Sequence, residues 1–284
     1  MPDRELKNDT IIYKRGVGYE LRLLLFKPES WSAHDKRTAI VWIHGGGWSS
    51  GEPERFGRHC RMFAGRGAVN FSVQYRLLPQ EGELQEDGAA RSVEECISDC
   101  KSAIRYIRGH ALQFGIHPDR IAVAGDSAGG HLAASMATLA GCDEPGEDLA
   151  TSAKVDLVVN CNGIVDFTGK WKMMIPQREC GQPVVNWMER HKHAQALSPL
   201  YNVAAGQPPM LIMHGLEDEV VIPEDAVRFY EAYTAAGNEA ELVLYAELKH
   251  AFILFDYTAA EVEVLRALGR IDDFLVSHHF LEAR

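Results

Sequence analysis

The sequence has little of several features that would point to particular classes of protein. Its 284 residues contain no run of 18 apolar residues, which argues against a membrane-spanning helix. Its six cysteines form no Cys-x-x-Cys pair, so neither a metal site nor a disulfide scaffold is indicated, and no cofactor is expected. Basic residues are outnumbered 29 to 40, and the net charge of −11 argues against nucleic acid or an anionic membrane surface as a partner.

The first residues also lack the apolar core of a signal peptide, since residues 1–5 read Met-Pro-Asp-Arg-Glu. This favours a cytoplasmic protein, with export as the alternative if a leader has been removed. Hydrophobic residues make up 46% of the chain, as in a globular protein. The length suits a single domain over residues 1–284 with a small insertion.

The most informative stretch is Gly125-Asp126-Ser127-Ala128-Gly129, which has the pattern of a nucleophile elbow. An apolar run, 120–124, precedes it and predicts a buried strand, and helix-compatible residues follow to about 140. Ser127 would then lie in a strained turn between strand and helix. Gly125 and Gly129 are expected to be required on either side of the serine, because larger side chains there would collide with the neighbouring strand and helix. A Gly-Ser turn without chemistry is the alternative.

A second motif, His44-Gly45-Gly46-Gly47, follows a predicted strand at 38–43. Its glycines allow the backbone to approach a ligand closely. The N–H groups of Gly46, Gly47 and Ala128 are therefore candidate donors to the oxyanion of a tetrahedral intermediate. His44 is expected to hold the loop by hydrogen bonding. A phosphate-binding turn is disfavoured because no Walker lysine follows and Gly-x-Gly-x-x-Gly is absent.

Predicted strands and helices alternate along most of the chain, which indicates a mainly parallel sheet covered by helices on both faces. The first two strands, 10–14 and 21–26, are expected to be antiparallel. Further strands are predicted at 69–74, 155–160, 210–213 and 241–246, and helices at 54–66, 92–108, 226–236 and 260–276. Ligands in such sheets bind beyond the carboxyl ends of the strands, where both motifs lie.

Together with residues 73–79 (Val-Gln-Tyr-Arg-Leu-Leu-Pro) and 117–121, the two motifs resemble the α/β-hydrolase esterases. The resemblance covers about residues 10–278 and is strongest to the HGGG-type branch, which includes hormone-sensitive-lipase-like, acetyl-esterase and feruloyl-esterase-like enzymes. It implies an α/β-hydrolase fold and a catalytic acid and histidine downstream of the serine.

The resemblance carries over to Asp218, in a segment similar to the family's HGxxD, and to His250, in a segment similar to its H-x-F. The implied triad is Ser127, Asp218 and His250, with His250 as general base. Glu217 and Glu219 are adjacent competitors for the acid. His131 and His214 are expected to be structural.

Residues 163–197 break the alternation and contain aromatic and methionine side chains, which suggests a small lid; packing of a surface excursion is the alternative. Trp171 and Trp187 in this segment, with Trp48 after the glycine loop, are the candidate substrate-binding residues. Few residues precede the glycine loop, so little chain is present there to form the N-terminal cap that hormone-sensitive-lipase-like enzymes usually carry. The resemblance therefore favours the acetyl-esterase and feruloyl-esterase-like enzymes and an open site for short acyl groups.

The sequence therefore predicts a serine carboxylesterase acting on small short-chain acyl esters, with acetylated or feruloylated carbohydrate as candidate substrates. The sequence does not specify the oligomeric state, and the resemblance implies a homodimer as one candidate assembly. Two alternatives remain open on the same fold. One is an amide hydrolase of the kynurenine-formamidase or peptidase type, and the other is a non-catalytic binding module.

Overall fold

A computed structural model of the chain describes residues 9–79, 88–90, 92–169, 178–179, 182–183 and 187–284. Its centre is an eight-stranded sheet in the order β1-β2-β4-β3-β5-β6-β9-β10. The strands are β1 (Asp9–Gly16), β2 (Tyr19–Phe26), β3 (Arg37–Ile43), β4 (Val69–Val73), β5 (Ile116–Asp126), β6 (Leu157–Cys161), β9 (Met210–Gly215) and β10 (Ala240–Tyr245).

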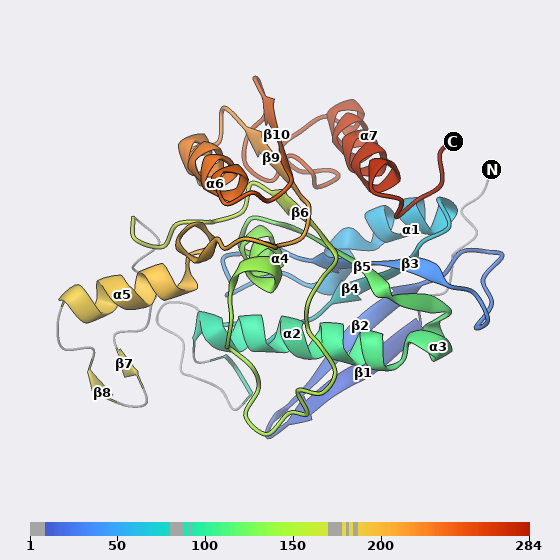
Figure 1. The fold of residues 1–284 in the computed structure, drawn as a ribbon, viewed down its shortest axis with the longest axis horizontal. Helices are drawn as coiled ribbons and strands as arrows, with labels where there is room; N and C mark the ends of the chain where they lie inside the picture. The colour runs from blue at the N-terminus through green and yellow to red at the C-terminus, as the bar shows by residue number, and fades with distance from the viewer. Residues whose placement is uncertain (1–8, 80–87, 91, 170–177, 180–181, 184–186) are drawn as a thin grey trace.

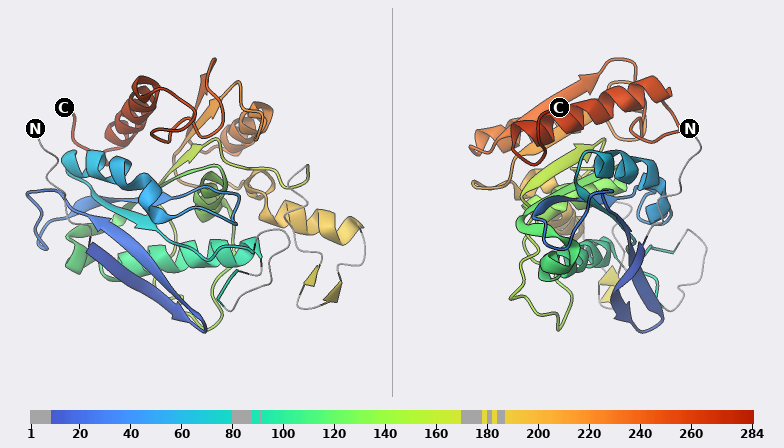
Figure 2. Two further views of the ribbon diagram at one scale, coloured as in Figure 1. Left: turned by 180° about the vertical axis from the view of Figure 1, so that it is seen from behind. Right: turned by 90° about the vertical axis from the view of Figure 1, so that its right-hand side faces the viewer.

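The sheet is parallel from β4 to β10 and antiparallel only at its first two strands. Figures 1 and 2 show β1 and β2 at one end of the sheet and β9 and β10 at the other. The expected α/β-hydrolase architecture and antiparallel start are thus confirmed.

Helices cover both faces of the sheet, and each face has its own apolar core. Helices α2 (Val93–Gly109), α4 (Ala128–Thr138) and α6 (Pro223–Ala235) pack on one face. Helices α1 (Gly57–Gly65) and α7 (Glu261–Ser277) pack on the other. The apolar stripe predicted on α2, including Ile97, Ile104 and Ile107, is buried.

Several short elements escaped the sequence analysis. The helix expected at 54–66 is divided into a 3-10 helix, η1 (Pro53–Phe56), and α1. The others are α3 (Ala111–Phe114), β7 (Arg178–Glu179), β8 (Gln182–Pro183), α5 (Trp187–Leu197) and the 3-10 helix η3 (Pro199–Asn202). Of these, β7, β8 and α5 lie in the segment expected to form a lid and project from the body in Figure 1.

Across the described residues, no helix is long and apolar enough to cross a lipid bilayer. The cysteines in those residues, at positions 60, 96, 100, 142 and 161, are all free thiols. Cys180 lies outside the described residues.

The sheet register brings the two sequence motifs together. Ile43, the last residue of β3, pairs with Gly125 near the end of β5. The glycine loop and Ser127 therefore leave neighbouring parallel strands at the same edge. On the other side of β5, Asp126 pairs with Cys161 of β6, and the Ser127 N–H donates to the Cys161 carbonyl over 3.0 Å.

Three buried histidines are expected to make the free energy of unfolding depend on pH. Burial lowers the pKa of His44, His59 and His131 from 6.5 to about 4 in each case. The unfolded chain therefore takes up these protons below about pH 6.5, whereas the folded protein stays neutral at these sites down to about pH 4. The free energy of unfolding should fall across this window, by about 3 kcal/mol per histidine at most.

Three carboxyls act in the opposite direction, because burial raises the pKa of the enclosed Asp126 to about 6, and partial burial also raises the pKa of Asp156 and Asp225. The histidine contribution to the free energy of unfolding is larger. The urea concentration at the midpoint of unfolding should therefore be lower at pH 4.5 than at pH 7.5. A midpoint that is constant or rises on acidification would contradict the assignment of neutral buried imidazoles.

Candidate active site

Ser127 lies in a tight turn between β5 and α4, at the N-cap of the helix. Its backbone has φ 54° and ψ −121°, a left-handed conformation that is costly for a residue with a side chain. A Cβ atom on Gly125 would lie 2.2 Å from the Gly129 carbonyl oxygen, and one on Gly129 would lie 2.0 Å from the Ile43 carbonyl oxygen. The structure therefore has the expected backbone strain at Ser127, and it leaves no room for a side chain at either glycine.

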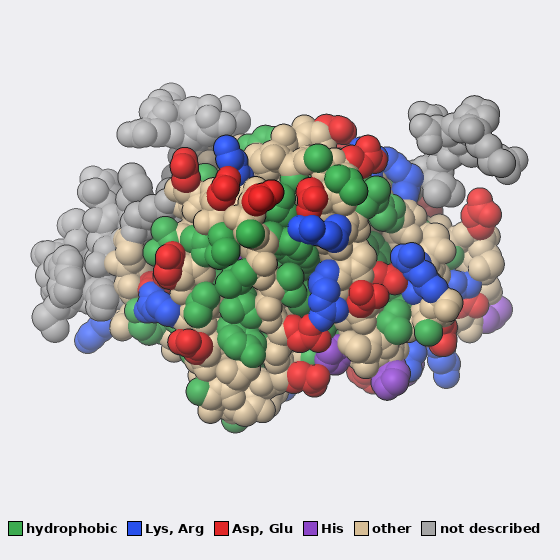
Figure 3. Space-filling model, turned by 90° about the horizontal axis from the view of Figure 1, so that it is seen from above, with side chains coloured by type: hydrophobic (Ala, Val, Ile, Leu, Met, Phe, Trp, Pro, Cys, Tyr) green, Lys and Arg blue, Asp and Glu red, His purple; other side chains and the backbone are tan. Residues whose placement is uncertain are grey.

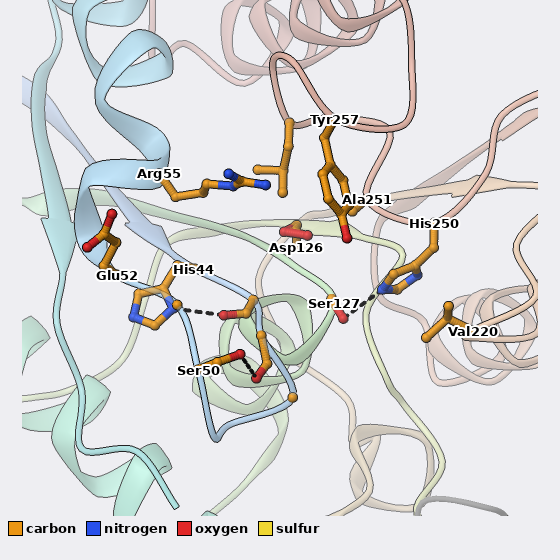
Figure 4. A pocket seen from close by; sticks show the side chains of 15 residues that line it. His44, Ser50, Glu52, Arg55, Asp126, Ser127, Val220, His250, Ala251 and Tyr257 are labelled. Carbon is orange, nitrogen blue, oxygen red and sulfur yellow. Dashed lines mark hydrogen bonds between the residues drawn. The ribbon is translucent and has the colours of Figure 1, made fainter. Parts of the chain in front are cut away.

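The structure brings Ser127, His250 and Asp218 into one hydrogen-bonded chain (Figure 4). The Ser127 Oγ lies 2.8 Å from His250 Nε2, and His250 Nδ1 lies 2.7 Å from Asp218 Oδ2. In the neutral imidazole, Nδ1–H donates to the carboxylate, which leaves Nε2 to accept the serine proton. This is the geometry of a general base next to a nucleophile.

Asp218 is held by a set of donors that the sequence analysis did not identify. Its Oδ1 accepts the backbone N–H groups of Val220 and Val221 at 2.8 and 2.9 Å. His214 Nε2 lies 3.1 Å from Oδ2. Burial by itself would raise the pKa of Asp218, but hydrogen bonds from His214, His250 and Val221 outweigh it and lower the pKa well below its usual range.

The two neighbouring carboxylates do not compete for this position. Glu217 and Glu219 are exposed, whereas Asp218 is buried and turned toward His250. His214 was expected to be structural, and it also donates to the Val221 carbonyl over 2.9 Å. Its imidazole therefore holds the acid loop closed around Asp218.

The loop that carries His250 is anchored by two residues without a sequence signal. The Thr258 hydroxyl donates to the His250 carbonyl over 2.6 Å. His59, buried on α1, donates from Nε2 to the Ile253 carbonyl over 2.8 Å. The His59 contact joins segments 194 residues apart, so neither spacing nor local pattern could indicate it.

The glycine loop presents its backbone to the same site. Among the described residues, the N–H groups of Gly46, Gly47 and Ala128 have no hydrogen-bond partner, and the first two residues line the pocket. His44 is buried, and its Nδ1 lies 2.8 Å from the Gly45 carbonyl oxygen, consistent with a loop-holding role. Tyr75 stacks on the His44 ring and donates to its carbonyl over 2.9 Å.

Replacement of Gly46 by alanine should distort this loop. Gly46 has φ +110°, and an added Cβ would lie 2.2 Å from the Ser50 carbonyl oxygen. We expect Gly46→Ala to lower kcat/KM for an ester about 100-fold, the cost of losing one oxyanion donor.

Gly47→Ala is the matched control, because its added Cβ would meet only the Ser49 hydroxyl at 4.0 Å, although its φ of +61° carries some strain. This variant should retain much more activity, and thermal unfolding should show both proteins folded. Equal activity of the two variants would contradict the proposed loop geometry.

Ser127 and His250 open into a pocket of about 620 Å³. Its other walls include Val220, Ala251 and Leu254 and the polar residues Glu52, Arg55, Asp126 and Tyr257. Arg55 and Tyr257 lie in no motif, and nothing in their local sequence patterns marks them as pocket residues.

Trp48 does not line this pocket, which corrects its expected contact with substrate. The backbone turns left-handed at Trp48, with φ 60°, and the indole is fully buried. Its Nε1–H donates to His131 Nδ1 over 3.3 Å, and its ring packs against Phe167. The side chain therefore supports the glycine loop from inside the protein.

Trp171 lies outside the described residues, as does the side chain of Trp187. Of the described part of 163–197, no residue lines the pocket. Phe167 is fully buried, as packing on the body would require. His131, also buried, packs between Trp48 and Phe167 as the sequence suggested.

The fold and the hydrogen-bonded Ser–His–Asp cluster define a serine hydrolase of the α/β-hydrolase class. The BD-FAE family model matches residues 25–233, and the chain belongs to this family.

Curated relatives point to the same class. The chain is 34% identical to esterase LipQ of Mycobacterium tuberculosis over 83% of its length and 54% of LipQ. It is 31% identical to the probable carboxylic ester hydrolase LipM of the same organism, over 79% of this chain and 52% of LipM. The chain thus spans about half the length of these two relatives. Carboxylesterase NlhH is 29% identical over 88% of this chain and 78% of NlhH.

A solved structure matches over the whole chain. Thermogutta terrifontis esterase 2 with bound propionate has a TM-score of 0.85 and 33% identity, covering 100% of this chain and 98% of the other. The same esterase has been solved phosphorylated by paraoxon, with a TM-score of 0.84. These relatives are all named as esterases or carboxylic ester hydrolases.

Proposed function

We propose that this chain hydrolyses short-chain carboxylic esters through an acyl-enzyme on Ser127. The observation that carries the proposal is the Ser127–His250–Asp218 chain of hydrogen bonds, which opens into a pocket beside unpaired amides. The structures of Thermogutta terrifontis esterase 2 with propionate and butyrate support short acyl groups by analogy.

The mechanism follows from the geometry. Ser127 Oγ attacks the ester carbonyl carbon while His250 Nε2 takes the hydroxyl proton. The N–H groups of Gly46, Gly47 and Ala128 stabilise the oxyanion of the tetrahedral intermediate. The intermediate collapses, and the alcohol leaves with the proton from His250. Water then attacks the acyl-enzyme by the same steps and releases the acid.

A substrate panel tests this function. We expect p-nitrophenyl acetate and butyrate to give the highest kcat/KM, with a fall of at least about tenfold toward decanoate. Acetylated and feruloylated sugars in the same panel test the carbohydrate expectation. A preference for decanoate would contradict the short acyl range, and faster turnover of a matched anilide than of the ester would favour the amide hydrolase.

The homodimer and the lid formed by residues 163–197 stay predictions. Figure 3 shows hydrophobic side chains among acidic ones on the face over α6, β10 and α7. Leu244 on the edge strand β10 and Val262 and Leu265 on α7 are exposed. Light scattering coupled to size-exclusion chromatography measures the assembly directly.

A further inference from the structure

Arg55 lines the same pocket as Ser127 and His250 and comes from the short helix η1. The side chain is exposed, and in Figure 4 it extends from η1 toward Tyr257. Its guanidinium carbon lies 5.0 Å from the centre of the Tyr257 ring, within cation–π range. A permanent positive charge therefore forms part of the pocket wall.

The guanidinium of Arg55 has spare hydrogen-bonding capacity. Within the described part of the chain it makes no hydrogen bond or ion pair, and its recorded contact is the Tyr257 ring. By contrast, Arg58, one turn further along, pairs with Asp256 at 3.3 Å and Glu261 at 2.5 Å. An arginine has five N–H donors in a fixed fork that matches a carboxylate, so Arg55 can accept a ligand without breaking a protein contact.

The two carboxylates that line the pocket do not neutralise this charge by contact. Glu52 lies on the His44 side in Figure 4, apart from the Arg55 guanidinium. Asp126 is only 1% exposed, and its Oδ1 has no partner among the described residues. An incoming anion therefore meets the exposed guanidinium before it meets the enclosed Asp126 carboxyl.

The charge of Arg55 also acts at the floor of the pocket. Burial raises the pKa of Asp126 to about 6, while the charges of His250 and Arg55 oppose this rise. The field of Arg55 thus reaches the residue next to Ser127, and a group bound by Arg55 would lie within the same pocket as the ester under attack.

We propose that Arg55 binds a carboxylate of the substrate, so that the ester cleaved at Ser127 also carries an anionic group. The inference rests on the proposed esterase function and narrows its substrate class to monoesters of dicarboxylic acids or esters whose alcohol bears a carboxylate. A charge-assisted, bidentate hydrogen bond of this kind contributes about tenfold or more to binding.

Two matched substrate pairs separate the acyl from the alcohol side. On the acyl side, p-nitrophenyl butyrate is compared with p-nitrophenyl hemisuccinate, and on the alcohol side phenyl acetate is compared with 4-carboxyphenyl acetate. Each is assayed with the wild type, Arg55→Gln, Arg55→Lys and the control Arg61→Gln. Arg61 is exposed on α1, contacts the Phe26 ring and does not line the pocket.

We expect Arg55→Gln to raise KM about tenfold or more for the charged member of one pair, with kcat nearly unchanged and little effect on its neutral member. The affected pair identifies the side that faces Arg55. Arg55→Lys should recover part of the loss, and Arg61→Gln should behave as the wild type. Equal effects on the neutral and charged members, or no effect on either pair, would overturn the proposal. Absence of turnover of all four esters by the wild type would instead refute the esterase function itself.

Discussion

Ser127→Ala is expected to lower kcat for p-nitrophenyl butyrate by about 10⁵-fold or more, because the acyl-enzyme can no longer form. A residual rate above that of water should remain, since the backbone donors and the pocket are intact. Steady-state and single-turnover kinetics measure the loss, and release of p-nitrophenol in a single turnover should slow by a similar factor.

Ser135→Ala is the matched control for this variant. Ser135 lies on the same helix, α4, and its hydroxyl donates to the His131 carbonyl over 2.8 Å, away from the pocket. This protein should keep near wild-type kcat, and thermal unfolding should show that both variants fold. Retention of full esterase activity by Ser127→Ala would place the nucleophile elsewhere.

Asp218→Asn is expected to lower kcat/KM by about 10⁴-fold, although the side chain keeps its shape. The carboxylate accepts N–H groups from His250, His214, Val220 and Val221, and an amide cannot accept all of them. His250 would then lose the partner that holds its Nδ1–H and leaves Nε2 free to accept the serine proton. Kinetics over pH 6–9 should show the deficit throughout, because the lost group is ionised across this range.

The two carboxylates next to Asp218 provide controls for Asp218→Asn, because the same carboxylate-to-amide change can be made at each of them. Glu217→Gln and Glu219→Gln change exposed side chains on either side of Asp218 and should leave kcat/KM within about twofold of the wild type, as surface substitutions usually do. A large loss in either control with a small loss in Asp218→Asn would assign the acid to a different residue of this loop.

The local sequence pattern could predict the strand, turn and loop that form the site, because the residues of each motif restrict the backbone conformation at that point. The apolar run before Ser127 and the glycines around it specify a strand and a sharp turn, and the structure has both. The left-handed conformation of Ser127 follows from the same pattern. The parallel sheet then places the loops after β3 and β5 side by side.

Contacts between distant segments could not be predicted in the same way. His59 supports the His250 loop through the Ile253 carbonyl, and Arg55 reaches the pocket from η1, but neither residue lies in a motif. Trp48 was misassigned because the position after the glycine loop suggested a ligand contact, whereas the left-handed turn directs the indole into the core. Side-chain direction at such a turn depends on tertiary packing.

Covalent labelling tests the central claim most directly. The wild-type protein is treated with a fluorophosphonate probe, digested, and mapped by mass spectrometry, with activity followed in parallel. The predicted result is stoichiometric labelling of Ser127, with loss of ester hydrolysis at the same rate and no labelling of Ser127→Ala. Labelling of a different residue that tracks the loss of activity, or full activity with Ser127 completely labelled, would contradict the assignment.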